Sequence, residues 1–230
     1  PRTAGQADWW REKIGDERTF IITGFPLWAI MAAMRILWMR ENEPEVMARA
    51  DKWLLIEDFL NHKLCGEIAT DYSMASCMQL LDQTTRCWSA ELLDASGIEA
   101  SLMPPLHASG TKLGVVHEEA AAATGLPAGT PVVLGGHDHI CGTLPVGAFR
   151  PGVVLDVTGT WESVLIALTE PNLTPEFRKT GMWVQSHVAR DRSSAAGATV
   201  AADMLEWFRK QFGSEAKLKA AEEGGEDWDH

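Results

Sequence analysis

One short segment, PVVLGGHDHICG at residues 131–142, constrains the fold of this chain more than any other. A β-branched apolar run stops at two glycines, and an aspartate between two histidines follows. A run of this length between turn residues predicts a buried strand, and the glycines free the backbone beyond it. Open α/β sheets bind ligands outside the carboxyl ends of their strands. Asp138 is therefore predicted to lie at a ligand site.

Helical patterns fill the first half of the chain, and strand patterns follow. The apolar segment 25–39 predicts a buried helix, because it carries Arg35 and is shorter than the roughly 20 residues of a membrane span. Trp53, Ile56, Leu60 and Leu64 recur at helical spacing before a stop at Gly66. We also expect helices from Ser89 to Gly97, from Glu118 to Gly125 and from Val200 to Gly213, and strands over 153–157, 163–168 and 182–188. This order indicates an α/β fold with a domain boundary soon after Asp138.

Composition narrows the class of protein. Of the 230 residues 46% are hydrophobic and 23% charged, which is typical of globular proteins. The net charge of −12 argues against nucleic-acid and membrane partners, since both need basic surfaces. The four cysteines contain no C-x-x-C pair, which argues against a zinc knuckle. Cysteines spaced in this way are more typical of a reducing, cytoplasmic location.

Asp138 and its two neighbours allow three interpretations. The carboxylate could be a general base that takes a proton from a hydroxyl nucleophile. It could instead cap a helix that begins at His139 or Ile140. As a third choice, His137 and His139 project to the same side of an extended chain, so a metal-dependent hydrolase could use both with Asp138. Two histidines do not complete a metal site, and the sequence offers no second short-spaced pair.

The turn Thr158-Gly159-Thr160 is the second candidate site. A glycine between hydroxyl residues at a hairpin turn exposes backbone N–H groups that could bind phosphate oxygens. Any hairpin also needs such a turn, so the pattern alone leaves both interpretations open.

Together these segments resemble the FGGY carbohydrate kinases, the group that contains glycerol kinase, xylulokinase and gluconate kinase. Around the domain junction the matching residues are Gly135, Asp138, Gly147, Pro151-Gly152 and Gly159-Thr160. Further upstream the family's Thr-Asp-x-Ser-x-Ala-Ser pattern is matched by Thr70, Asp71, Ser73, Ala75 and Ser76. The likeness extends from about Pro1 to Gly213.

The resemblance implies a two-domain, actin-like (ribonuclease H-like) α/β fold, of which this chain holds part. Residues 1–145 would be the C-terminal part of the sugar-binding domain, and residues 146–230 the first part of the ATP-binding domain. Asp138 would be the general base, with His139 and His137 lining the substrate pocket. Thr158, Gly159 and Thr160 would hold the γ-phosphate of ATP. The expected cofactors are ATP and Mg²⁺, the substrate is a sugar, ketose or polyol, and a homodimer is allowed.

The chain also departs from the family pattern. It lacks the Asp-x-Gly-Thr phosphate loop and the sugar-contacting Trp-x-Asp, and the adenine site would lie beyond His230. Ala202 stands where relatives often place a glycine before the helix tryptophan, here Trp207. We therefore expect a fragment with little or no kinase activity by itself. A non-catalytic sugar-binding module is the remaining alternative.

Overall fold

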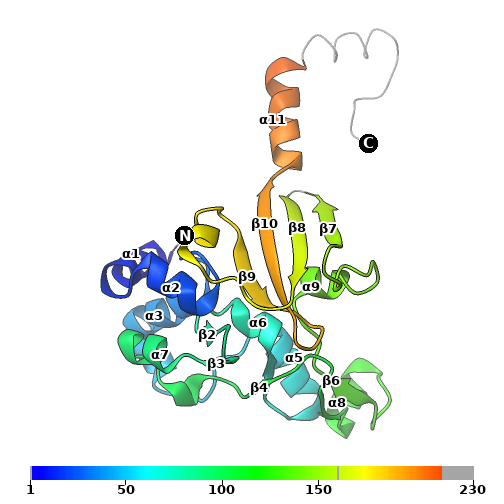
Figure 1. Cartoon of the computed structure of the whole chain (residues 1–230). Coiled ribbons are helices and arrows are strands. Elements are labelled where there is room, and N and C mark those ends of the chain that lie inside the picture. The colour runs from blue at the N-terminus through cyan, green and yellow to red at the C-terminus, as the bar shows by residue number, and fades with distance from the viewer. Residues whose placement is uncertain (1, 160, 214–230) are drawn as a thin grey trace. The chain divides into compact units, whose positions relative to one another are not determined.

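The computed structural model describes residues 2–159 and 161–213 (Figure 1). Its contacts divide the chain into two units. The first contains the residues up to Leu155 together with Leu165–Ala196, and the second contains Asp156–Val164 together with the residues from Gly197 onward.

Helices dominate the first 125 residues and recur between the later strands. In chain order they are α1 (Ala4–Lys13), α2 (Asp16–Thr23), α3 (Ala32–Asn42), α4 (Pro44–Met47), α5 (Ile56–Cys65), α6 (Tyr72–Ser76), α7 (Ala90–Ser96), the 3₁₀ turn η1 (Ala100–Leu102), α8 (Glu118–Thr124), α9 (Asp138–Gly142), α10 (Pro175–Arg178) and α11 (Ala202–Phe212). Among the described residues, no helix is both long and apolar enough to cross a membrane.

Over residues 2–159 and 161–213 the strands form three two-stranded sheets and one four-stranded sheet. They are β1 (Thr70–Asp71) with β4 (Leu106–His107), β2 (Leu81–Asp82) with β3 (Cys87–Trp88), β5 (Lys112–Val115) with β6 (Pro131–Val133), and β7 (Val154–Thr158), β8 (Trp161–Leu168), β10 (Ser193–Val200) and β9 (Trp183–Ser186) in that order across the larger sheet. The β1–β4 pair is parallel, whereas β5–β6 and β9–β10 are antiparallel.

The main hydrophobic core lies among the first helices. Figure 1 shows α1, α2, α3 and α7 grouped together, and the buried side chains of this group include Trp10, Met34 and Leu37. The prediction of a buried helix over 25–39 is thus correct for its second part, while the helix itself begins only at Ala32. The residues before it follow Gly24, whose carbonyl accepts a hydrogen bond from the Val184 N–H at 2.8 Å. A Cβ at Gly24 would lie 2.2 Å from the Val184 carbonyl oxygen, so this close approach requires glycine.

Predicted helix ends agree with the structure. Gly66, Gly97 and Gly125 end α5, α7 and α8 with positive φ angles of 82°, 63° and 78°. The Ser89 hydroxyl caps α7 by accepting a hydrogen bond from the Leu92 N–H.

Helix α5 forms as predicted, but its apolar residues are not all buried. Ile56 and Leu60 are 76% and 54% exposed, and Trp53 precedes the helix. The residues that α5 buries are Asp58 and Asn61. The Asp58 carboxylate accepts the Leu55 N–H at 2.9 Å. Hydrophobic periodicity cannot anticipate a buried carboxylate.

The strand before Asp138 is buried on one face only, which corrects the prediction of a buried strand. Val132 and Leu134 are buried, whereas Val133 is 45% exposed. Among the described strands β6 pairs with β5 alone, and its inner face packs with Val116 and Ala120. A two-stranded antiparallel sheet can leave its other face in solvent.

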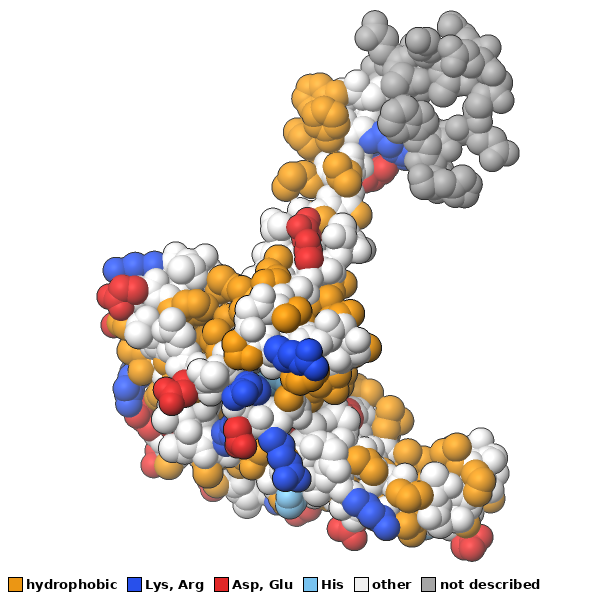
Figure 2. All heavy atoms as spheres, turned by 45° about the vertical axis from the view of Figure 1, so that its right-hand side comes forward, with side chains coloured by type: hydrophobic (Ala, Val, Ile, Leu, Met, Phe, Trp, Pro, Cys, Tyr) orange, Lys and Arg blue, Asp and Glu red, His pale blue; other side chains and the backbone are white. Residues whose placement is uncertain are grey.

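The C-terminal segments correct two further expectations. Strand β10 is missing from the sequence prediction, and Val200 belongs to this strand rather than to the helix that follows. The five large apolar side chains of α11 are all more than half exposed (Figure 2): Met204, Leu205, Trp207, Phe208 and Phe212. The amphipathic stripe is therefore present on α11, but it is not packed against other described residues.

Candidate active site

Asp138 is the first residue of the five-residue helix α9, directly after the loop that leaves β6. Its side chain is 85% exposed. The His139 N–H donates a hydrogen bond to Asp138 Oδ1 at 2.8 Å. Within the described part of the chain Oδ2 has no partner. The helix thus begins one residue earlier than a capping role would need, and one carboxylate oxygen remains available.

The two histidine side chains lie close to each other, and one of them lies close to the Asp138 carboxylate. His137 Nδ1 is 3.1 Å from Asp138 Oδ1, and the His137 and His139 rings meet edge to face with centroids 5.6 Å apart. Burial lowers the pKa of His137, although the negative charge of Asp138 opposes this shift. The neutral imidazole is therefore favoured at neutral pH, and Asp138 is not neutralised by a cation on His137.

The three residues do not form a metal centre. Over the described ranges, no group of three or more histidine, cysteine or acidic side chains is arranged to hold a metal ion. The buried histidine His187 makes its contacts elsewhere: its Nδ1 accepts the Ala189 N–H at 2.8 Å, and its Nε2 lies 3.0 Å from Thr143 Oγ1. This donor arrangement does not support the metal-dependent hydrolase.

The loop before Asp138 is held by side chains from two other elements. Glu57 Oε1 on α5 accepts the Gly135 N–H at 3.0 Å. Ser73 Oγ on α6 accepts the His137 N–H at 2.9 Å. The same hydroxyl donates to Asp71 Oδ1 at 2.5 Å. In the sequence, Asp71 and Ser73 stand out only as members of the family pattern. No sequence signal indicates that Glu57 contacts this loop.

Burial raises the pKa values of two carboxylates on α5, one of which bonds this loop. Burial is the main cause that brings the pKa of Glu57 to about 7, and the charge of Asp71 adds to it. Burial also raises the pKa of Asp58 to about 6. Burial is the main cause that raises the pKa of the Cys77 thiol to about 12, and the negative charges of Asp71 and Asp138 add to it. Cys77 is therefore a neutral thiol rather than a nucleophile.

The predicted phosphate-binding turn belongs to the second unit. Thr158 is the exposed last residue of β7. The Gly159 N–H donates to the Trp161 carbonyl at 3.0 Å, and the Gly159 carbonyl accepts the Ala202 N–H at 3.2 Å. Thr160 lies outside the described residues. The role of these three residues stays a prediction.

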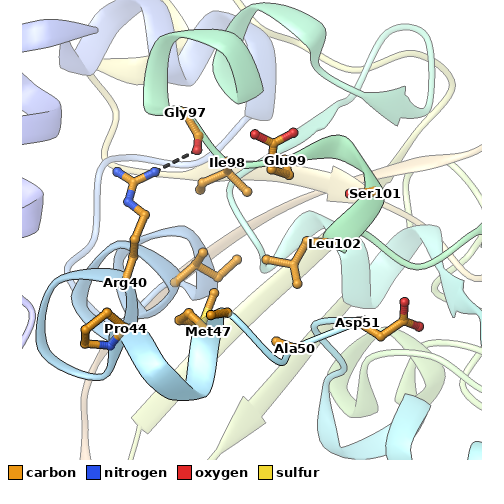
Figure 3. Close-up of a pocket in the computed structure, with 12 residues that line it drawn as sticks. Arg40, Pro44, Met47, Ala50, Asp51, Gly97, Ile98, Glu99, Ser101 and Leu102 are labelled. Atoms are coloured by element: carbon orange, nitrogen blue, oxygen red, sulfur yellow. Dashed lines mark hydrogen bonds between the residues drawn. The ribbon is translucent and has the colours of Figure 1, made fainter.

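Two surface cavities lie in the first unit, and neither contains a predicted site residue. One, of about 350 Å³, is lined by α3, α4 and the segment after α7, with Arg40 donating to the Gly97 carbonyl at 2.7 Å (Figure 3). The other, of about 530 Å³, lies between α5 and α8. The Arg40 guanidinium is bonded to main-chain carbonyls, so it does not mark a ligand site in the first cavity.

Comparison with known proteins adds an independent finding. Residues 1–145 match the family profile described as the FGGY family of carbohydrate kinases, N-terminal domain. L-fuculokinase of Escherichia coli K12 is 32% identical over 212 residues, which are 92% of this chain and 45% of that protein. Autoinducer-2 kinase of the same strain is 37% identical over 193 residues, which are 84% of this chain and 36% of that protein. The chain therefore spans less than half the length of these relatives.

Solved structures agree with this result. Xylulose kinase from Rhodospirillum rubrum superposes with a TM-score of 0.86 at 27% identity, covering 97% of this chain and 45% of that one. Glycerol kinase from Plasmodium falciparum has a TM-score of 0.80 at 19% identity, covering 91% of this chain and 43% of that one, which is a likeness of fold alone.

Proposed function

Because the chain belongs to the FGGY family of carbohydrate kinases, we propose that it is the central part of an enzyme that phosphorylates a hydroxyl of a sugar, ketose or polyol with ATP. Its α/β fold is the corresponding part of the actin-like ATPase fold of these kinases. We place the boundary between the sugar-binding and ATP-binding domains after residue 145, where the family match ends.

Asp138 is the proposed general base. The observation that carries this role is its exposed carboxylate, with Oδ1 fixed by the His139 N–H and Oδ2 free to receive the proton of the attacking hydroxyl. Phosphoryl transfer needs little covalent help from the protein, so placing the hydroxyl and removing its proton are the tasks left to this site. His139 and His137 flank the carboxylate and would contact the other substrate hydroxyls.

The phosphate-binding role falls to Thr158, Gly159 and Thr160. In the structure the Gly159 N–H is bonded to the Trp161 carbonyl, so binding of the γ-phosphate would require exchange of that bond. Mg²⁺ would arrive with ATP and neutralise charge on the phosphates. Kinases bind this ion mainly through phosphate and water oxygens with one or two carboxylates.

The test is phosphoryl transfer to a panel of acceptors. The full-length enzyme that carries this sequence is incubated with Mg²⁺-ATP and with the sugars and polyols after which the relatives are named: fuculose, autoinducer-2, xylulose, gluconate and glycerol. We expect ADP and one phosphorylated product in equal amounts with at least one acceptor, and little or no turnover from the 230-residue chain alone. Sugar binding without product would instead identify a non-catalytic module, and bound stoichiometric zinc with hydrolysis would identify the hydrolase.

A further inference from the structure

We propose that Ser73, supported by Asp71, and Glu57 are positioning residues that fix the loop carrying Asp138 in the orientation needed for proton transfer. This inference rests on the function proposed above, because it gives the three side chains a catalytic consequence only if Asp138 is the base.

The direction of the hydrogen bonds at Ser73 is determined by its surroundings. A serine hydroxyl has one proton, and here it is donated to Asp71 Oδ1. Asp71 is fully buried, and the same oxygen also accepts the Ser73 N–H at 2.8 Å and the Ser109 hydroxyl at 3.1 Å. Ser73 Oγ is thereby left as an acceptor, and it receives the N–H of His137, the residue before Asp138. A charge-assisted bond to the carboxylate strengthens this chain of contacts.

The second contact fixes the other end of the loop. Glu57 Oε1 accepts the Gly135 N–H, three residues before Asp138. The two anchors come from α5 and α6, which are separate helices of the first unit. Both ends of the segment from Gly135 to His137 are therefore bonded to side chains outside the loop.

Gly136, between the two bonded residues Gly135 and His137, is tightly packed. A Cβ at Gly136 would lie 2.4 Å from Val188 Cγ1 and 2.8 Å from Ser73 Oγ. The loop backbone thus packs directly against the serine that holds it, and a shift toward α6 is blocked.

Asp138 depends on this backbone for its position. Its side chain is 85% exposed, and its hydrogen bond from the described residues comes from the adjacent His139 N–H, which moves with it. A base displaced by about 1 Å can lose about a hundredfold in rate. Contacts that hold the loop should therefore affect turnover more than they affect nucleotide binding.

The experiment compares two buried serines of α6 in the full-length enzyme. Ser73→Ala removes the acceptor of the His137 N–H. Ser76→Ala is the matched control, since Ser76 is equally buried but its Oγ accepts the Ser186 N–H at 3.1 Å rather than an N–H of the Asp138 loop. We expect Ser73→Ala to speed hydrogen exchange of the His137 amide about tenfold and to lower kcat about tenfold or more, with KM for ATP within twofold of wild type. Ser76→Ala should lower the melting temperature without either effect.

Three results separate this proposal from the function on which it rests. Loss of turnover in Asp138→Asn with unchanged kcat in Ser73→Ala would overturn the positioning role and leave the kinase assignment standing. Equal losses of kcat in Ser73→Ala and Ser76→Ala would overturn it as well, because the effect would then be general destabilisation. Full turnover in Asp138→Asn would remove the base and the positioning role together.

A second variant serves if Ser73→Ala does not fold. Glu57 is only partly buried, so Glu57→Ala removes the Gly135 anchor with less disturbance of the core. It should speed exchange of the Gly135 amide and lower kcat, again with little change in KM for ATP. Faster exchange with unaltered kcat would contradict the proposal.

Discussion

At the scale of single residues, this chain uses its polar side chains mainly to fix backbone. His187 is buried, its Nδ1 accepts a backbone N–H, and its Nε2 proton is therefore left for Thr143 Oγ1, whose own proton goes to the Ile140 carbonyl at 2.6 Å. The sequence alone does not predict this role of His187. A single histidine has no periodicity, so its burial depends on contacts that the sequence does not display.

The buried state of His187 predicts a dependence of stability on pH. Burial is the main cause that lowers its pKa to about 4, so between about pH 6.5 and pH 4 the unfolded chain binds a proton at His187 that the folded chain does not. The free energy of unfolding therefore falls as pH falls, by about 3 kcal/mol at most. The raised pKa values of Glu57 and Asp58 have the opposite effect on the free energy of unfolding. The contribution of His187 is therefore measured as the difference in that free energy between wild type and a His187 variant. Urea unfolding of wild type and His187→Gln should show the wild type losing stability relative to the variant below pH 6.5. A constant difference from pH 7 to pH 4.5 would contradict this.

At the scale of elements, local signals identified helix ends well and sheet context poorly. The cap at Ser89 and the stops at Gly66, Gly97 and Gly125 depend on neighbouring residues only, so the sequence predicts them. Strand β10, with the sequence SSAAGATV, was missed because small residues have weak strand preference. It becomes a strand because it lies between β8 and β9, where Ser193, Ser194, Ala195 and Ala196 are buried.

The loop after β6 carries a prediction at the same scale. The φ of Gly136 is not positive, so glycine is needed there for space rather than for backbone conformation. Gly136→Ala should lower the free energy of unfolding, measured in urea, by about 1–3 kcal/mol, because the new Cβ would overlap Val188 and Ser73. Gly135→Ala is the adjacent control, since its Cβ would meet only the flexible Glu57 carboxylate at 3.2 Å. Equal costs for the two variants would show that the loop relaxes more freely than the packing indicates.

At the scale of the whole molecule, the family resemblance supplied what local patterns could not. Spacing alone left Asp138 as base, cap or metal ligand, and only the order of motifs along the chain pointed to a kinase. The match over residues 1–145 confirms the family. The contacts of Ser73 and Glu57 with the Asp138 loop could not be predicted, because they join residues that are 64 and 78 positions apart in the sequence.

The most direct test of the account is the effect of Asp138→Asn on the full-length enzyme, measured as kcat and as sugar affinity in the same preparation. Asparagine keeps the size of the side chain and its oxygen acceptor but cannot take a proton at neutral pH. Asp94→Asn, on an exposed carboxylate of α7, serves as the control. If Asp138 is the general base, kcat falls by about a hundredfold or more while the dissociation constant of the sugar stays within a few-fold of wild type. A kcat for Asp138→Asn within threefold of wild type would contradict the central claim.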